Sequence, residues 1–582
     1  MNTTLSEKIS SSSDAPAKLQ GPVIAAVISG LACLAMLTLS VWVLDKGFDL
    51  TDEGYYLLSH DAPHQYLCFT FVFHLVKLIP LLPGIDTIVQ LRVMHLSCII
   101  SGAAILWWGV VTWGQTVSIK MLSFRSFRLT LLFLAISGNL LTNAFLPQTI
   151  SYNGLTSFFV NTSAGILFAA IGHQGRGHNW KNISHLLVVL AGFIAGLSIF
   201  SKLSTGICVF AAEIVFLLVF SQLNRKINVA AYVTGFAASI AAGFSFVVSP
   251  QEFVTKLTMF PPDKTHTLPI MLRDYVSDLA RNVTRGAVIS IPLALFCFKK
   301  RFPDKLFYPV FALVAATVTL YGFDTSYLAK VNFYYLTATW CWVLYALNAE
   351  KRKKEIILGL VFLGLLPFVS AAGTNRELFV QASLSLGPWL LMSAIVGSIV
   401  SETAQKRGPV VLTLTVIFTS VMLAIQFFSG LLVEPYRNPY SLAESKYQFP
   451  NSRISGIKLD LPTLNELTEM RSLLEKNGFQ KGDLIIAYEK PGLVYAISGQ
   501  SVGLPWFNPT CPGANAKAIV YAMPKTPHRL FLIFDWANEL NDETLDAFRK
   551  VGKPFPESFK LLGRPNNRFT HKPMFVYGLN SN

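Results

Sequence analysis

The stretch PVIAAVISGLACLAMLTLSVWVL, residues 22–44, decides the fold class, and the acidic stretch DKGFDLTDEGYYLLSHDAP, residues 45–63, follows it directly. The first stretch is uncharged and long enough to cross the hydrocarbon core of a membrane as one helix. It is too long for the apolar part of a signal peptide, and no convincing cleavage site follows, so we expect a retained helix. Several carboxylates therefore lie directly after the end of a predicted membrane-spanning segment.

The composition agrees with a membrane protein. Of 582 residues, 52% are hydrophobic and only 14% are charged, which is too apolar for a soluble globular protein. The net charge of +15 sits in short loops between apolar runs, so it indicates topology, and we expect no nucleic-acid partner. The seven cysteines form no framework, and we expect no structural disulfide.

Apolar runs along the chain predict a polytopic α-helical membrane protein with about thirteen transmembrane helices. The predicted spans lie near 22–44, 93–115, 128–146, 154–172, 184–201, 204–221, 228–249, 286–298, 306–323, 333–348, 355–372, 386–401 and 410–432. We expect the stretch 65–82 to lie along the membrane surface without crossing, and the loop 250–285 to hold an amphipathic surface helix over about 267–283.

The basic loops predict the orientation. With 65–82 outside the count, they all fall on the side of the N-terminus, which the positive-inside rule makes cytoplasmic. These loops contain Lys120, Arg125, Arg128, Arg176, Lys181, Arg225, Lys226, Lys299, Lys300, Arg301, Lys351, Arg352, Lys353, Lys354, Lys406 and Arg407. We therefore expect a cytoplasmic tail over 1–21, an extracytoplasmic C-terminus and a location in a bacterial cytoplasmic (inner) membrane.

The chain divides at the last apolar run. Residues 22–432 form the predicted membrane domain, with long outer loops 45–92 and 250–285, and residues 433–582 form a small α/β extracytoplasmic domain. In that domain TLNELTEMRSLLEKNG predicts a helix that opens with a capping box from Thr463 to Glu466. DLIIAYEK, LVYAISG and RLFLIFDW predict strands, and NDETLDAFRKVG predicts a second helix.

The adjacent carboxylates Asp52 and Glu53 allow two interpretations. They can simply cap the first turn of a helix that runs into YYLLS, where acidic residues are favoured. Alternatively they have a functional role, because carboxylates at the end of a membrane helix are energetically unfavourable unless they are solvated or functional. Spacing alone does not separate these alternatives.

The surroundings of the pair resemble the GT-C superfamily of membrane glycosyltransferases. The resemblance rests on Asp52-Glu53-x-Tyr55, on Pro63-x-x-Tyr66 and on Arg92 at the start of the second span. The plan is similar to the protein O-mannosyltransferases and especially to the aminoarabinose transferases that modify lipid A. In architecture the resemblance extends over most of 22–432. Individual residues match only over about 50–92 and at a few later positions.

The chain also departs from the family. Asn153 stands where the family often has a second acid, and Ala62 replaces a lysine that, with the acid kept here as Asp61, helps to hold metal and lipid phosphate in the aminoarabinose transferases. Lys202 in FSKLSTG resembles a Lys-Gly/Pro turn of the family. With the lysine missing, phosphate binding would fall to Lys202, Lys264, Arg273 or Lys330. A divalent metal held by Asp61, His64 or His266 is an open possibility, and no ligand spacing supports it.

The resemblance implies a sugar donor linked to polyprenyl phosphate, and transfer with inversion needs one carboxylate to take the acceptor's proton. The leaving phosphate needs cations. We expect Asp52 to be the base and Glu53 to orient the acceptor or the loop, although the pair could be reversed. The expected substrate-binding residues are Tyr55, Tyr56, Asp61, His64, Arg92, Asn153, Lys202, Lys264, His266, Arg273 and Lys330.

The resulting hypothesis is a membrane glycosyltransferase acting at the outer face on a glycolipid, polysaccharide or protein acceptor. The alternative is a transporter or flippase for lipid-linked sugars. A transporter favours ionisable residues at mid-membrane and broken helices in paired halves, and the sequence pattern suggests neither. A third hypothesis, a structural envelope subunit, would make Asp52 dispensable.

Overall fold

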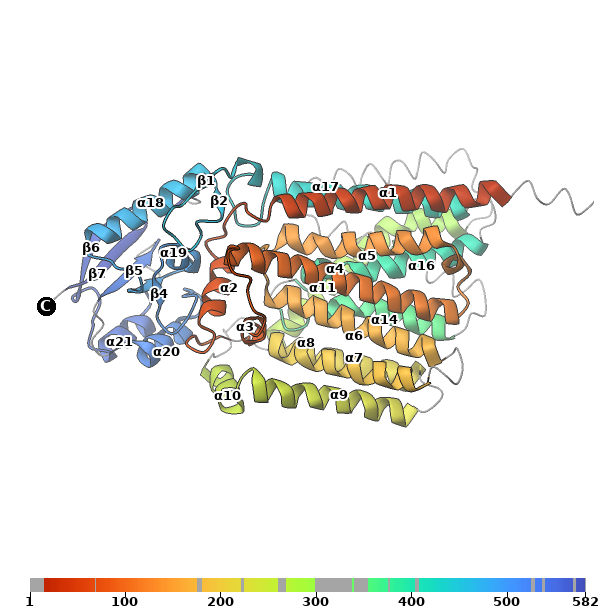
Figure 1. The fold of residues 1–582 in the computed structure, drawn as a ribbon, viewed down its shortest axis with the longest axis horizontal. Coiled ribbons are helices and arrows are strands. Elements are labelled where there is room, and N and C mark those ends of the chain that lie inside the picture. Colours follow the sequence, from red (N-terminus) through yellow and green to blue (C-terminus); the bar gives the residue numbers. More distant parts are fainter. Residues whose placement is uncertain are drawn as a thin grey trace, which may run out of the picture.

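The computed structural model describes residues 15–68, 70–174, 181–220, 225–259, 268–298, 338–339, 354–374, 377–403, 408–524, 529–535, 540–568 and 572–580. These residues form an elongated bundle of helices with an α/β domain at one end (Figure 1). Short helices of the first long loop lie between the two parts.

Nine described helices are long and apolar enough to cross a membrane. They are α1 (Ala15–Trp42), α4 (Thr87–Thr116), α5 (Arg125–Phe145), α6 (Tyr152–Gln174), α7 (Lys181–Ser201), α8 (Leu203–Phe220), α9 (Arg225–Phe246), α14 (Lys354–Ala371) and α17 (Gly408–Leu432). A tenth span forms if the segments Leu378–Ser385 and Gly387–Glu402, bent by 77°, count as one. The bent pair contains α15 (Leu378–Ala382), η5 (Ser383–Ser385) and α16 (Gly387–Thr403). The polytopic helical fold is thereby confirmed.

The other three predicted spans have different outcomes. Segments 306–323 and 333–348 fall outside the described residues, except for 338–339. Segment 286–298 lies in the second half of α11 (Leu268–Phe298), which also contains residues 268–283 of the predicted surface helix. The prediction of two separate helices is therefore wrong. No proline lies between 283 and 286 to end the first helix, so the chain continues as one.

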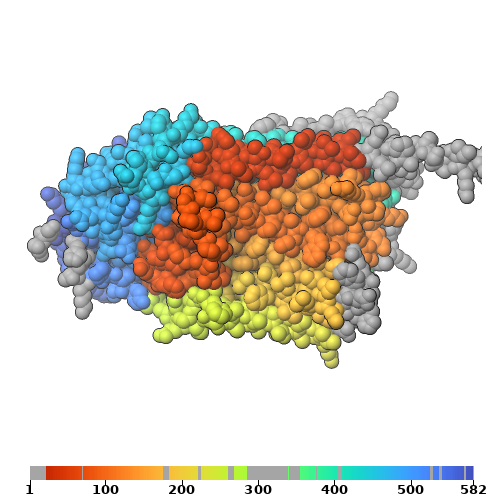
Figure 2. All heavy atoms as spheres, in the orientation of Figure 1, coloured from red at the N-terminus to blue at the C-terminus, as the bar shows by residue number. Residues whose placement is uncertain are grey.

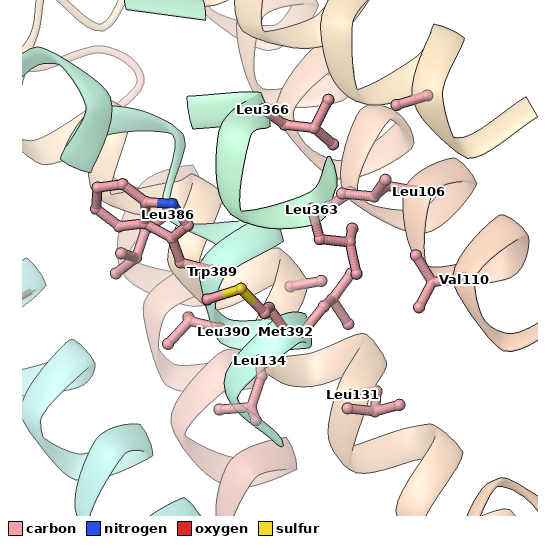
Figure 3. Close-up of a cluster of buried hydrophobic side chains, with 14 of the residues drawn as sticks. Leu106, Val110, Leu131, Leu134, Leu363, Leu366, Leu386, Trp389, Leu390 and Met392 are labelled. Atoms are coloured by element: carbon pink, nitrogen blue, oxygen red, sulfur yellow. The ribbon is translucent and has the colours of Figure 1, made fainter. Parts of the chain in front are cut away.

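The bundle core is built from aliphatic side chains around Trp389 (Figure 3). The indole Nε1 of Trp389 donates a hydrogen bond to the carbonyl of Gly364 at 2.8 Å, which satisfies its polar group. Elsewhere α4 and α6 approach so closely that a Cβ on Gly109 would collide with the carbonyl of Gly165. Small residues at helix contacts are typical of membrane bundles, where packing replaces the hydrophobic driving force.

The first long loop forms α2 (Asp52–Asp61) and α3 (Val72–Lys77) at the end of the bundle that carries the α/β domain. The helix in the described part of 65–82 is the six-residue α3, which is too short to cross a membrane. The expected position of this stretch along the membrane surface stays a prediction. The short helix α10 (Pro250–Met259) lies at the same end. The basic residues of η1 (Lys120–Ser123) and of the starts of α5 and α9 lie at the opposite end.

The α/β domain contains a five-stranded mixed sheet of order β4-β3-β5-β7-β6. Its strands are β3 (Leu484–Ala487), β4 (Gln500–Ser501), β5 (Leu530–Phe534), β6 (Phe559–Gly563) and β7 (Phe575–Leu579), and its helices are α18 (Leu461–Lys476), α19 (Pro491–Ala496), α20 (Pro512–Ala522) and α21 (Asp542–Lys550). β4, β3 and β5 run parallel, whereas β7 is antiparallel to β5 and to β6. A two-stranded sheet of β1 (Tyr447–Gln448) and β2 (Lys458–Leu459), with η6 (Leu442–Glu444), links it to the bundle.

Two predictions in this domain are wrong. LVYAISG is not a strand but lies largely in α19, because Pro491 occupies the first helical turn, where proline is tolerated. The helix α18 is capped by Asp460, whose carboxylate accepts a hydrogen bond from the backbone N–H of Thr463 at 2.8 Å. Thr463 is therefore inside the helix, and the capping box from Thr463 to Glu466 does not form. The strands β3 and β5 and the helix α21 are confirmed.

The α/β domain contacts the first loop through backbone hydrogen bonds. Figure 2 shows this loop between the domain and the bundle. Gly47 N–H donates to the carbonyl of Lys458 at 2.8 Å, and Lys458 N–H donates to the carbonyl of Asp45 at 2.7 Å. Gly492 N–H of α19 donates to the carbonyl of Leu50 at 2.8 Å. A Cβ on Gly54 of α2 would collide with the backbone of Gly492, so the two segments meet without side chains between them.

We expect Gly54→Ala to destabilise the protein by about 1–3 kcal/mol, because the added methyl meets rigid backbone atoms. Thermal unfolding of the purified protein in detergent measures the effect. Gly578→Ala is the matched control, since its Cβ would meet only the flexible side chain of Leu562, at 3.1 Å. Equal losses of thermal stability in the two variants would contradict a tight contact between α2 and α19.

Candidate functional site

The acidic loop before α2 is organised by Asp49. Its carboxylate accepts hydrogen bonds from the backbone N–H and hydroxyl of Thr51, at 2.8 and 2.6 Å, and from the backbone N–H of Glu53 at 3.2 Å. These bonds satisfy donors at the start of α2, which is the capping role expected of an acidic residue there. The carboxylate of Glu53 in turn accepts a hydrogen bond from the backbone N–H of Asp49 at 3.2 Å, so Asp49 and Glu53 stabilise the start of α2 together.

Glu53 forms a buried ion pair with Arg92. Its two carboxylate oxygens accept from Nε and Nη2 of Arg92, each at 2.9 Å, and each side chain is only 2% exposed. The remaining guanidinium hydrogens go to the carbonyls of Leu44, Lys46 and Gly47 at 2.8–2.9 Å. All five N–H donors of Arg92 are therefore used within the protein.

A small cavity adjoins this pair. Its volume is ≈ 20 Å³, and its lining includes Asp49, Glu53, Arg92 and Tyr436. That volume suffices for about one water molecule and not for a sugar. Within the described structure Glu53 and Arg92 thus position the loop, and Asp52 is the carboxylate of the pair that reaches the surface.

Asp52 is held by two residues that directly follow the last span. The hydroxyl of Tyr436 donates to Oδ2 of Asp52 at 2.5 Å, and Nη1 of Arg437 lies 3.2 Å from Oδ1. The side chains of Asp52 and Arg437 are 15% and 33% exposed. Both partners were missed in the sequence analysis, although an aromatic-arginine pair just after the last apolar run was a usable signal.

Arg437 is fixed in its place from several sides. Its Nη1 also donates to the hydroxyl of Thr51 at 2.6 Å, and its guanidinium carbon lies 5.7 Å from the ring centre of Trp506. Its backbone has φ 50°, a left-handed conformation that is costly for a residue with a side chain. The guanidinium of Arg437 thus places a fixed positive charge next to Asp52, the candidate base.

Two side chains of the buried loop have pKa values that are shifted from their ordinary values. Burial, and secondly the charge of Asp52, raise the pKa of Asp49 to about 7. Burial, and secondly the charge of Lys256, lower the pKa of His74 to about 4, so this imidazole is neutral at neutral pH. Both shifts arise because charged forms are poorly solvated away from water.

The tyrosines predicted to bind substrate are packed inside the loop. Tyr55 and Tyr56 are buried, and the ring of Tyr55 lies 6.0 Å from that of Trp506 in the α/β domain. The ring of Tyr56 lies 5.6 Å from Phe73 of α3 and 6.0 Å from Tyr152 of α6. They therefore join the loop to both the domain and the bundle.

The other predicted site residues are not all brought together. Asp61 pairs with Nη1 of Arg453 at 2.7 Å, and Arg273 is exposed with a contact to neighbouring Asp274. Asn153 is half-buried at the start of α6, and Lys202 lies between α7 and α8 with Nζ 3.5 Å from the carbonyl of Ala371. Lys264, His266 and Lys330 lie outside the described residues. His64 belongs to a separate cluster with His74 and Glu252.

A buried carboxyl group lies among the described membrane helices. Glu213 in the middle of α8 is fully buried, and the hydroxyl of Ser163 lies 2.5 and 2.6 Å from its two oxygens. The expectation that no ionisable residue sits at mid-membrane is therefore wrong. A single acid hardly lowers the hydropathy of an apolar run, which is why the pattern did not reveal it.

No protein-family model and no curated protein sequence matches the chain. Among solved structures it is similar to the Archaeoglobus fulgidus oligosaccharyltransferase tethered to an acceptor peptide with the NVT sequon. That match has TM-score 0.43 and 14% identity over 97% of this chain and 74% of that one. A structure of AglB from the same organism, with an inhibitory peptide and a dolichol-phosphate, gives TM-score 0.45 and 14% identity over 88% and 69%. Neither TM-score reaches 0.5, so this likeness by itself assigns no activity.

We expect Glu53→Gln to lower the stability of the protein by about 3–5 kcal/mol, because it leaves the buried guanidinium of Arg92 without its counter-charge. Thermal unfolding in detergent measures this. Asp52→Asn is the matched control and should cost less than about 1 kcal/mol, since its ion pair is partly exposed. Equal melting temperatures for the two variants would refute the division of roles within the pair.

Asp49→Asn should change how stability depends on pH. Between about pH 4 and 7 the folded protein keeps a proton on Asp49 that the unfolded chain has lost, so this residue makes stability fall as pH rises. The contribution is at most about 1.4 kcal/mol per pH unit. His74 has the opposite trend, so the readout is the difference between variant and wild type in melting temperature from pH 4 to 7. A difference that does not vary with pH would contradict the raised pKa.

Proposed function

We propose that the protein is a membrane glycosyltransferase of the GT-C type. It moves a sugar from a polyprenyl-phosphate donor to a glycolipid, polysaccharide or protein acceptor at the outer face of a bacterial cytoplasmic membrane. The observation that carries the proposal is the partly exposed carboxylate of Asp52 at the end of the membrane helices, with the guanidinium of Arg437 3.2 Å away. A base for the acceptor hydroxyl and a cation for the leaving phosphate are the groups that this transfer needs.

In the proposed reaction an acceptor hydroxyl gives its proton to Asp52 as its oxygen attacks the anomeric carbon. The new carbon–oxygen bond forms as the bond from the anomeric carbon to the phosphate oxygen breaks. The electron pair leaves with polyprenyl phosphate, and inversion follows from attack on the opposite face. The protonated Asp52 then loses its proton to solvent, which restores the carboxylate.

The surrounding residues have supporting roles in this proposal. Arg437 stabilises the departing phosphate by a charge-assisted hydrogen bond. The hydroxyl of Tyr436 donates a hydrogen bond to Oδ2 of Asp52 and so holds this side chain in place. Glu53 and Arg92 fix the loop and do not touch substrate. Lys202 is a second candidate cation at the same end of the bundle, and the proposal extends to Lys264, His266, Arg273 and Lys330 as expected from the sequence.

The proposal includes an orientation and a role for the α/β domain. Residues 1–21 form a cytoplasmic tail, and residues 433–582 lie outside the membrane and contribute to acceptor recognition. A cavity of ≈ 680 Å³ between α10, α20 and α21 has room for part of an acceptor. Its lining is mixed, with the charged residues Lys517, Glu543 and Lys550 beside the apolar residues Met259 and Val520.

The test compares host cells that carry wild type, Asp52→Asn or a deletion of the gene. Mass spectrometry of surface glycolipids and polysaccharides measures the transferred sugar as a mass increment. We expect Asp52→Asn, at normal protein level, to lose the same increment as the deletion. Arg437→Gln should reduce it at least about tenfold, because it removes the cation that stabilises the leaving group.

Glu213→Gln is the matched control, since it removes a buried carboxyl group of the membrane helices. It should keep the increment. The buried Glu213 is an observation that favours a transporter of lipid-linked sugars. If Glu213→Gln abolishes the increment and Asp52→Asn keeps it, the transporter replaces the glycosyltransferase as the better hypothesis.

A further inference from the structure

A second cluster of side chains lies beside the first loop, away from Asp52. Nδ1 of His64 is 3.2 Å from both carboxylate oxygens of Glu252, and Nε2 of His74 is 3.3 Å from Oε1. One ligand atom from each residue lies within 4.8 Å of the other two. The residues come from three segments: the turn after α2, the helix α3 and the helix α10.

These separations fit a metal ion. In a tetrahedral site with bonds of about 2.0–2.1 Å, neighbouring ligand atoms are about 3.3–3.4 Å apart. The two nitrogen-to-oxygen separations of 3.2–3.3 Å correspond to this edge length. Two imidazoles and one carboxylate are also a ligand set that zinc binds, with the fourth position left open.

The protein holds the cluster in place. Lys256, one turn after Glu252 on α10, lies 2.7 Å from Oε1 and also donates to the carbonyl of Pro63 at 2.7 Å. Lys256 thereby fixes both the carboxylate and the turn that carries His64. His74 is buried, whereas the His64 side chain is 66% exposed, so the cluster opens to solvent on one side. An ion has an entry path without disturbing the bundle.

We propose that His64 Nδ1, His74 Nε2 and the carboxylate of Glu252 bind a divalent transition metal, with zinc as the best fit. Of the residues that the sequence suggested, this ligand set keeps His64 and leaves out Asp61, which is paired with Arg453. His74 and Glu252 are new members of the set, and His266 lies outside the described residues. The metal would tie α3 and α10 to the turn after α2. The inference does not depend on the proposed transfer reaction.

The competing explanation is a hydrogen-bonded cluster without metal. In that arrangement each imidazole donates an N–H to Glu252, whose negative charge is balanced by Lys256. Nδ1 of His74 has no hydrogen-bond partner among the described residues, which is compatible with a proton on Nε2. Metal content and metal binding separate the two explanations directly.

The test uses the full-length protein in detergent, purified without a polyhistidine tag. Elemental analysis measures the metal that copurifies, and titration of the chelator-treated protein with Co²⁺ measures binding through the visible absorption of a tetrahedral site. Wild type should bind about one ion per chain. His64→Ala and Glu252→Gln should each weaken Co²⁺ binding at least about tenfold, because each removes a ligand.

His185→Gln is the matched control, because His185 lies on α7 and contacts Asn228 at 2.9 Å, far along the chain from the cluster. It should bind metal like wild type. Because His64 is exposed, His64→Ala should fold normally. Zn²⁺ should raise the melting temperature of wild type and of His185→Gln but not that of His64→Ala. Wild type that binds neither ion, or His64→Ala that binds as tightly as wild type, would overturn the inference.

Discussion

The buried pair of Glu53 and Arg92 is the interaction on which the rest of the loop depends. A guanidinium enclosed between a membrane helix and a loop must satisfy all its donors, and in this protein one carboxylate and three carbonyls do so. The carbonyls belong to the segment that leaves α1, and the carboxylate belongs to the first turn of α2. One side chain of α4 therefore sets the path of the chain from the first span to Asp52.

The α/β domain completes this arrangement from the other side. Arg568 donates to the carbonyl of Phe48, Gly492 donates to the carbonyl of Leu50, and Tyr436 and Arg437 reach Asp52 from the segment that joins the last span to the domain. The loop is thus held between bundle and domain through both backbone and side chains. The domain therefore helps to build the site, whatever it adds to acceptor recognition.

The sequence predicts the membrane helices well because their signal is local. In lipid, an apolar run of sufficient length satisfies its backbone hydrogen bonds by forming a helix. Nine such helices lie within the described residues. Short apolar runs are less informative, and LVYAISG became helix where a strand was predicted because a buried segment lacks a distinguishing period. The amphipathic period of the surface helix and the apolar run after it suggested two helices, whereas the described chain continues as one helix from Leu268 to Phe298.

The site could be predicted only in part. The residue types in 45–63 indicate an outer acidic loop, but the division between Asp52 and Glu53 depends on Arg92, which lies 39 residues after Glu53. The contact of Tyr436 with Asp52 spans 384 residues, and no local pattern reports it. The cluster of His64, His74 and Glu252 likewise assembles only when α3 and α10 meet.

A cryo-electron microscopy structure of the protein in lipid nanodiscs, with added polyprenyl phosphate, would test the proposed site of transfer most directly. We expect phosphate density within hydrogen-bond distance of the Arg437 guanidinium and close to Asp52, with the prenyl chain running along the membrane helices. Phosphate density at the opposite end of the bundle, or beside Glu213 between the helices, would contradict a reaction at Asp52.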